Sequence, residues 1–394
     1  MLQVGFARSV ITPPLPIQLA GHRGPRTATA VADDLCVRAL AISFRDTLAA
    51  VVSCEIIWLP RRLVMRIREL VSRTAAVRPE NLMVACTHTH SGPDTLDWYA
   101  FAPPVPDWWL DWFAHAVSSA VFQATQRLAP VRASRGTADF PFAVNRRLTE
   151  AGSVFREPNP GGKVDRRLTT VHFNAGERCL GGFVHAAMHP VLLGSESRAI
   201  SGDWCGEMVR RLEARHGGIW LFLNGAAGDN NPAKWSGSSY AEMLRVGRSC
   251  ARAASTAIEA ANPLEIRSFV SRSAEARFPH QPHPYLVVEQ RRRGLEDGGL
   301  MLEAQTLQLG EVTLVALGGE CLYDTASALT LSKPGVLVVS YANDYVGYLP
   351  RAFHYREGGY EPAASMLNAE GAEAYLELAL GLLLSCHAAL NCET

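Results

Sequence analysis

The stretch CTHTHSGPD, residues 86–94, places two histidines one residue apart directly after the apolar run NLMVA of residues 81–85. The apolar run predicts a buried β-strand, and the Ser-Gly-Pro after the histidines predicts a turn at its end. In an extended segment, residues i and i+2 face the same side, so the rings of His88 and His90 can reach one centre. The spacing therefore fits a metal site, and it equally fits two hydrogen-bonded loop histidines.

Other polar residues follow apolar runs elsewhere in the chain. HAAMHPVLL (185–193) contains His189, GGECLYD (318–324) contains Glu320, and YANDYVGYLP (341–350) contains Tyr345 and Tyr348. Sites are usually built from loops at strand ends, so these segments predict one convergent pocket. Taken singly, a histidine before proline, a glutamate in a turn or two packed tyrosines would each fit a structural role.

Composition restricts the class of protein. The 394 residues are 48% hydrophobic and 19% charged, with a formal net charge of zero, which is typical of a folded protein with a sizeable core. No basic block stands out, so we expect no nucleic-acid partner. We expect neither a secretory signal nor a membrane span, because the apolar run near the C-terminus is short and contains Glu377. Nine cysteines without a C-x-x-C pair predict reduced thiols and a cytoplasmic location.

The hydrophobic pattern predicts an α/β fold in which mixed β-sheets pack with helices. Strand-like runs are 36–44, 48–57, 81–86, 168–173, 180–188, 219–227, 307–317 and 335–342. Helix-like runs are 60–76, 107–126, 203–216, 239–261 and 363–390. We interpret residues 1–394 as a single domain, with 274–300 as a lid or a surface insertion. Trp108 and Trp112, four residues apart, predict either a packed helix face or an aromatic wall over the pocket.

Taken in order, the motifs resemble the neutral or alkaline ceramidase family over about residues 4–370. The resemblance is carried by THTHSGP (87–93), NRR (145–147), MHP (188–190) with ISGDW (200–204), GGE (318–320), NDYVGYLP (343–350) and GGYEPAAS (358–365). The first of these motifs is highly specific, and the others gain weight from their order. The resemblance implies a ceramidase-like catalytic domain that binds zinc.

Carried over residue by residue, the resemblance implies four zinc ligands: His88, His189, Glu320 and Tyr348. Two imidazoles with oxygen donors suit zinc and leave a position for water or substrate. The resemblance also implies that His90, Arg146 and Tyr360 lie around the polar part of the substrate. We expect Tyr345 to bind substrate beside them.

The chain departs from the family at GDNNP (228–232), where Asn231 stands in place of a serine proposed to act at the scissile amide. A carboxamide is not a useful nucleophile, so we expect water activated by zinc to attack instead. His90 or Asp229 would then accept a proton, and Asn231 would donate a hydrogen bond to the developing oxyanion. Arg146 would pair with a substrate carboxylate. We also expect no C-terminal immunoglobulin-like domain of the kind the family has.

The sequence therefore predicts a zinc-dependent amidohydrolase whose partner is a small molecule with an amide or ester bond. Three alternatives stay open. The first is a ceramidase or lipid amidase that uses zinc-activated water alone. The second is a repurposed biosynthetic zinc enzyme for acyl transfer, ring opening or ring closure. The third is a non-catalytic binding protein on the same scaffold.

Overall fold

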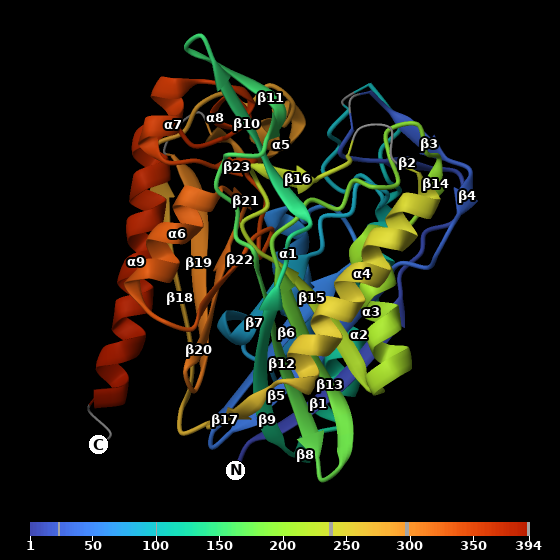
Figure 1. The fold of residues 1–394 in the computed structure, drawn as a ribbon, viewed down its shortest axis with the longest axis vertical. Coiled ribbons are helices and arrows are strands. Elements are labelled where there is room, and N and C mark those ends of the chain that lie inside the picture. The colour runs from blue at the N-terminus through green and yellow to red at the C-terminus, as the bar shows by residue number, and fades with distance from the viewer. Residues whose placement is uncertain (23, 100, 236–238, 296–298, 392–394) are drawn as a thin grey trace.

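Three β-sheets that share one apolar core form the centre of the molecule (Figure 1). The structure is a computed structural model, and it describes residues 1–22, 24–99, 101–235, 239–295 and 299–391. The first sheet has the order β7-β6-β5-β1-β8, with β1 Gln3–Val10, β5 Cys36–Phe44, β6 Thr47–Cys54, β7 Leu82–Cys86 and β8 Ala129–Pro130. The second has the order β15-β13-β12-β9-β17, with β9 Arg132–Asp139, β12 Arg167–Ala175, β13 Arg178–Ala186, β15 Ile219–Asn224 and β17 Asn262–Leu264. The third has the order β18-β19-β20-β22, with β18 Phe269–Phe278, β19 Leu300–Leu309, β20 Val312–Leu317 and β22 Val336–Val339.

Shorter strands surround this centre. They are β2 Ile17–Leu19 with β3 Arg26–Ala28, β4 Ala30–Val31 with β14 Ala199–Ile200, the trio β10 Ala143–Glu150, β11 Ser153–Asn159 and β16 Asn230–Pro232, and β21 Glu320–Cys321 with β23 Tyr348–Leu349. The helices are α1 Arg61–Thr74, α2 Asp107–Thr125, α3 Asp203–His216, α4 Tyr240–Glu259, α5 Val287–Arg293, α6 Tyr323–Ser332, α7 Ala352–Glu357, α8 Tyr360–Ala363 and α9 Ala369–Asn391, with a 3-10 turn η1 at Pro79–Asn81.

The period of two along the strands explains how each sheet faces two cores. On β6, Ala49 and Val51 point into the core that the three sheets share, whereas Ala50 and Val52 point toward α1 and α2. Helices cover the other face of each sheet: α1 and α2 on the first, α3 and α4 on the second, and α9 along the third (Figure 1). None of the described helices combines the length and the apolar composition that a membrane span requires.

Parallel strand pairs decide where the site forms. Each of the three sheets contains one adjacent parallel pair near its end: β6 with β7, β13 with β15, and β20 with β22. The loops after these strands are bonded to one another, since Cys86 N donates to Tyr341 O (3.1 Å) and Ser340 N donates to Asn224 O (2.9 Å). Loops from all three sheets therefore meet at one edge of the core, as the carboxyl ends of parallel strands often do.

The prediction of mixed sheets packed with helices is confirmed. The run 307–317 is not one strand, because a turn with Gly310 at φ +58° separates β19 from β20. The last helix begins at Ala369, after the separate short helix α8. In the segment 274–300, residues 274–278 complete β18 and α5 lies in the connection that follows, while 296–298 lie outside the described residues. A lid role for this connection stays a prediction.

The tryptophans of α2 are arranged differently from the expectation. Trp109 is buried with Phe113 and Val117 against the first sheet. Trp108 and Trp112 lie beside this buried stripe on the solvent side of α2, where they are 59% and 42% exposed, and the Trp112 ring still contacts Trp109 with centroids 6.4 Å apart. Core packing of this pair is therefore wrong, because the apolar stripe of the helix passes through Trp109.

Candidate metal centre

The loop after β7 brings His88 and His90 together through an unusual backbone conformation. His88 has φ +71°, in the left-handed region that residues other than glycine rarely adopt. Its amide donates to Ile56 O (3.0 Å), and its ring nitrogen Nε2 lies 3.3 Å from Nε2 of His90. The two rings therefore converge through a strained turn and not through the extended segment that the spacing predicted. Strain of this kind is concentrated at functional sites.

Four buried side chains point their ligand-type atoms at one another. His88 Nε2 lies 3.4 Å from Glu320 Oε2, and His189 Nε2 lies 3.1 Å from the same oxygen. His88, His90 and His189 form a group whose ligand atoms all lie within 4.8 Å of one another. In a tetrahedral zinc site with bonds of about 2.0–2.1 Å, ligand atoms are about 3.3–3.4 Å apart. The spacing thus suits a zinc ion between the side chains.

The histidine tautomers also fit a cation. Nδ1 of His88 lies 2.9 Å from Ile57 O, and Nδ1 of His189 lies 2.6 Å from Ala227 O. A carbonyl oxygen only accepts, so each Nδ1 carries the hydrogen and each Nε2 presents a lone pair. His189 Nε2 has no hydrogen-bond partner among the described residues, yet it faces a carboxylate oxygen at 3.1 Å. Two buried acceptors at this distance require a cation or a proton between them.

Two tyrosines hold the Glu320 carboxylate. Tyr345 Oη donates to Oε1 at 2.6 Å, and Tyr341 Oη donates to Oε2 at 3.4 Å. Burial alone would raise the pKa of Glu320, but its interactions with His88 and His189 outweigh burial and hold that pKa well below 4.5. The ring of Tyr341 also stacks on His88, with centroids 3.9 Å apart. Tyr345, which we predicted to bind substrate, therefore contacts the carboxylate that we predicted to bind zinc.

Tyr348 and Glu320 are fixed relative to each other by the backbone. The two residues are direct partners in the parallel pairing of β21 with β23. Tyr348 Oη accepts a hydrogen bond from Arg146 Nη2 at 2.9 Å. Burial raises the pKa of the Tyr348 phenol well above 10, and the Arg146 guanidinium opposes that rise. A phenol oxygen beside a buried cation can act as an oxygen donor to a metal.

Arg146 is fully buried and is committed to partners inside the protein. Besides Tyr348, it donates to Glu361 Oε1 (3.1 Å) and to Asn231 Oδ1 (3.2 Å). Glu361 compensates its charge, so a substrate carboxylate would compete with Glu361 for Arg146. The contact also orients Asn231: its Oδ1 faces Arg146, and its Nδ2 has no hydrogen-bond partner in the described part of the chain.

Asp229 and Tyr360 lie around the edge of this group. The Asp229 carboxylate accepts from Tyr323 N (3.1 Å) and from Asn145 Nδ2 (3.4 Å), and it lines a separate cavity of about 180 Å³. Burial raises the pKa of Asp229 to about 7. The described contacts do not bring Asp229 to the histidines. Tyr360 packs edge-on against Tyr348, with centroids 5.5 Å apart.

Sequence reasoning missed His22. Its ring meets the His90 ring edge-on, with centroids 5.0 Å apart, and burial lowers its pKa to about 3. The neighbouring Gly21 has φ +94°, and a Cβ there would lie 2.4 Å from His90 Nδ1. The only signal in the sequence was a histidine beside a glycine in a Pro- and Gly-rich segment, which is too common a pattern to indicate a site.

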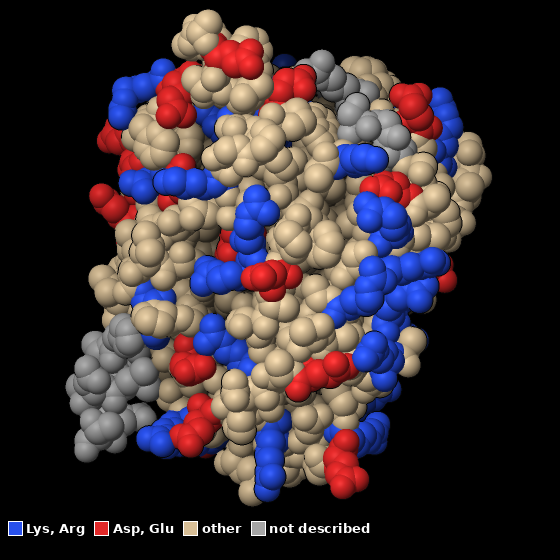
Figure 2. Space-filling view, in the orientation of Figure 1, with Lys and Arg blue, Asp and Glu red and all other residues tan. Residues whose placement is uncertain are grey.

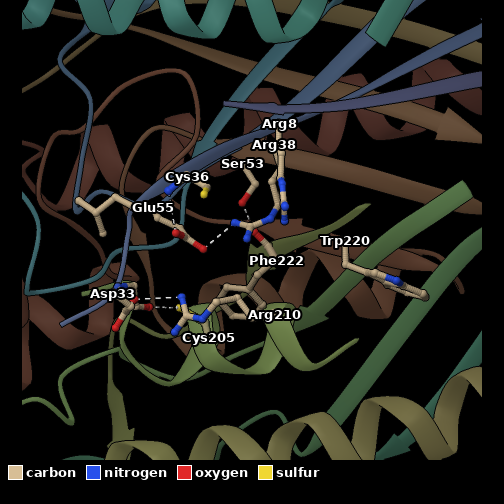
Figure 3. Close-up of polar contacts among 12 residues, drawn as sticks. Arg8, Asp33, Cys36, Arg38, Ser53, Glu55, Cys205, Arg210, Trp220 and Phe222 are labelled. Carbon is tan, nitrogen blue, oxygen red and sulfur yellow. Dashed lines mark hydrogen bonds and ion pairs between the residues drawn. The ribbon is translucent and has the colours of Figure 1, made fainter. Parts of the chain in front are cut away.

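A partly buried polar network reaches the histidine loop, and Figure 3 shows the part of it in which Asp33 contacts Arg210. Asp33 accepts hydrogen bonds from Ser201 Oγ, from Gly202 N (2.8 Å) and from Arg210 Nη1 (2.9 Å). Ser201 O in turn accepts from Thr89 Oγ1 at 2.7 Å, and Thr89 stands between the two histidines of the loop. Asp33 therefore positions the turn on which the loop rests.

Comparison with solved structures identifies the architecture. The neutral ceramidase from Pseudomonas aeruginosa matches with a TM-score of 0.78 and 17% sequence identity, over 98% of this chain and 75% of the other. A ceramidase complexed with C2 matches with a TM-score of 0.77 and 16% identity, over the same shares of the two chains. Protein-family models give no match, and neither do curated protein sequences. At these identities the structural matches establish the fold, and the expected ceramidase-like fold is confirmed.

Proposed function

Because the chain has the fold of the neutral ceramidases, we propose that it is a zinc-dependent hydrolase that cleaves an amide C–N bond of a small substrate. One observation carries the proposal. The Nε2 atoms of His88 and His189 lie 3.4 Å and 3.1 Å from Glu320 Oε2, and His189 Nε2 has no hydrogen-bond partner among the described residues. A buried arrangement of this kind suits a divalent cation with nitrogen and oxygen ligands.

In this proposal His88, His189, Glu320 and Tyr348 hold the metal. Zinc bound there would polarise the scissile carbonyl group and lower the pKa of a water molecule. Tyr345 fixes one carboxylate oxygen of Glu320, and the backbone carbonyls on both Nδ1 atoms fix the histidine rings. Such partners of the ligands set the geometry of a metal site and tune its affinity.

The remaining residues divide the proton transfer and the charge stabilisation. His90 lies beside His88, and its Nδ1 has no hydrogen-bond partner among the described residues, so we assign the proton transfer to His90. Asp229 is less suited, because its contacts are to Asn145 and Tyr323. The Nδ2 group of Asn231 is a buried donor without a partner, which suits a hydrogen bond to the oxyanion that forms during acyl transfer.

The structural matches favour a second candidate, an amidase that acts on lipid amides. Both matched proteins are ceramidases, and they cover 98% of this chain. Asn231 in place of the family serine separates this chain from a serine-assisted mechanism, so we place small amides first and lipid amides second. The seven described cysteines are free, which supports our proposal of a reducing, cytoplasmic location.

The test is metal content by elemental analysis of the purified protein beside two variants. His88→Ala removes a proposed ligand, and His115→Ala removes an exposed histidine of α2 as a matched control. We expect about one zinc per chain in the native protein and in the control, and none in His88→Ala. Fluorogenic N-acyl amides with short and long acyl chains then separate the two candidate substrates. A native protein that binds no metal after zinc is supplied would refute the proposal.

A further inference from the structure

A groove of about 580 Å³ lies between α3 and α4, on the side of these helices that faces away from the second sheet. Its polar lining consists of five arginines, one glutamate and one serine, namely Arg210, Arg211, Arg215, Arg248, Arg252, Glu207 and Ser255. Figure 2 shows blue side chains gathered over this pair of helices, on the right of the view. The groove is distinct from the metal centre, none of whose residues line it.

The spacing of arginines along α3 and α4 creates this cluster. Arg211 and Arg215 are four residues apart on α3, and Arg248 and Arg252 are four residues apart on α4. Residues at this spacing share one helix face, so each helix presents a pair of guanidiniums to the groove. The helices approach closely at Gly247, where a Cβ would lie 2.8 Å from Glu207 Cβ. The sequence shows no basic block because the cluster forms only when the helices pack.

The carboxylates of the groove do not balance the arginines. Glu207 is shared by Arg211 (2.6 Å), Arg248 (3.7 Å) and Arg210 (3.8 Å). Arg252 donates to Ser249 Oγ, and no carboxylate in the described part of the chain lies at ion-pair distance from it. Counting also Asp33, which pairs with Arg210, and Glu259, which pairs with Arg215, five guanidiniums face three carboxylates, an excess of two positive charges. Like charges this close attract an anion.

We propose that this groove binds a soluble anion that carries two or more phosphate groups. Guanidinium groups bind phosphate oxygens through paired hydrogen bonds, and arginines on two facing helices can contact neighbouring phosphates together. The apolar part of the lining is only Ala214 and Ala251. A membrane-docking surface would present large apolar side chains for insertion, and the lining has none. The chemistry therefore favours a dissolved polyphosphate-type ligand over a lipid surface.

Isothermal titration calorimetry with inorganic tripolyphosphate at low ionic strength tests this proposal. The test variant is Arg211→Gln/Arg252→Gln, which removes one arginine from each wall. Arg210 stays intact because it also holds Asp33 behind the histidine loop. The matched control is Arg245→Gln, an exposed arginine of α4 that pairs with Glu242 and does not line the groove. Thermal unfolding confirms that each variant is folded.

We expect micromolar binding to the native protein and to the control. The double variant should bind about a hundredfold or more weakly, since each charge-assisted hydrogen bond contributes about tenfold. Three results would overturn the proposal. They are no binding to the native protein at millimolar tripolyphosphate, equal loss in the Arg245→Gln control, and undiminished binding to the double variant, which would locate the anion outside this groove. Binding to phosphatidylglycerol vesicles without binding to tripolyphosphate would also overturn it, in favour of a membrane surface.

Discussion

Replacing Tyr345 with phenylalanine should weaken zinc binding by about tenfold to a hundredfold. The substitution removes a single hydroxyl group, which donates to Glu320 Oε1 at 2.6 Å. The ring stays in place against Trp58, with centroids 4.8 Å apart, so packing is largely preserved. Without the hydroxyl, one oxygen of a buried carboxylate loses its donor and Glu320 loses its fixed orientation toward His88 and His189.

The magnitude follows from the type of hydrogen bond. A hydrogen bond to a charged group contributes about 1.5–3 kcal/mol. Because about 1.4 kcal/mol corresponds to a factor of ten in an equilibrium constant, the loss corresponds to about one to two orders of magnitude in metal affinity.

Tyr341→Phe is the matched control. Its hydroxyl donates to the other oxygen of the same carboxylate at 3.4 Å, which is long for a hydrogen bond. Its ring stacks on His88, and phenylalanine preserves that contact. We therefore expect Tyr341→Phe to weaken zinc binding by less than about threefold.

Competition with a fluorescent zinc chelator measures the affinity, and steady-state kinetics on a cleaved amide separate kcat from KM. An unchanged zinc affinity in Tyr345→Phe, together with a raised KM, would refute the role that we assign to this hydroxyl. That result would instead support the original expectation that Tyr345 binds substrate.

Three further predictions concern stability. Arg146→Ala should lower the free energy of unfolding by about 2–3 kcal/mol in chemical denaturation, because it removes buried hydrogen bonds to Glu361, Asn231 and Tyr348. Arg147 still pairs with Glu361 at 2.6 Å, so the carboxylate keeps one cation. A change below about 1 kcal/mol would contradict this role of Arg146. Burial raises the pKa of Asp229 from 3.8 to about 7 in the folded protein. The protonated carboxyl group therefore contributes its full stabilisation below about pH 4, and this contribution is lost as the pH rises to about 7. Asp229→Asn should therefore flatten the decline in stability between about pH 4 and pH 7, and equal slopes in urea titrations would count against it. Trp109→Ala should cost about 3–5 kcal/mol, whereas Trp108→Ser should cost less than about 0.5 kcal/mol, and similar thermal shifts in the two variants would place both side chains in the same environment.

The sequence predicted the elements whose apolar residues are continuous or helically spaced. The run 36–44 coincides with β5, and the run 203–216 coincides with α3. Strands such as β9 and β18 were missed, since most of their side chains are polar and partly exposed. Backbone pairing with a neighbouring strand holds them in the sheet, and a single sequence does not display that pairing.

The sequence also predicted part of the candidate site and missed the rest. His88, His189 and Glu320 each follow an apolar run, which predicted a convergent pocket, and the resemblance to the ceramidase family implied them as ligands; the strands end at one edge of the core. The contact of Tyr345 with Glu320 was missed because it depends on the path of the loop after β22. The arginine groove was missed because its arginines come from α3 and α4, and the sequence does not show that these two helices pack together.

The proposed ligands follow strands of three different sheets, and this arrangement has a consequence for biosynthesis. When residues 1–319 have been synthesised, the chain contains both histidine loops but not Glu320. Strand β22, which completes the third sheet, is synthesised later. At the site proposed here, a metal would therefore be bound with full affinity only after residues 1–348 have been translated and the three sheets have packed. Metal binding would then stabilise only chains in which the three sheets have assembled, because a misassembled chain lacks one of the proposed donors.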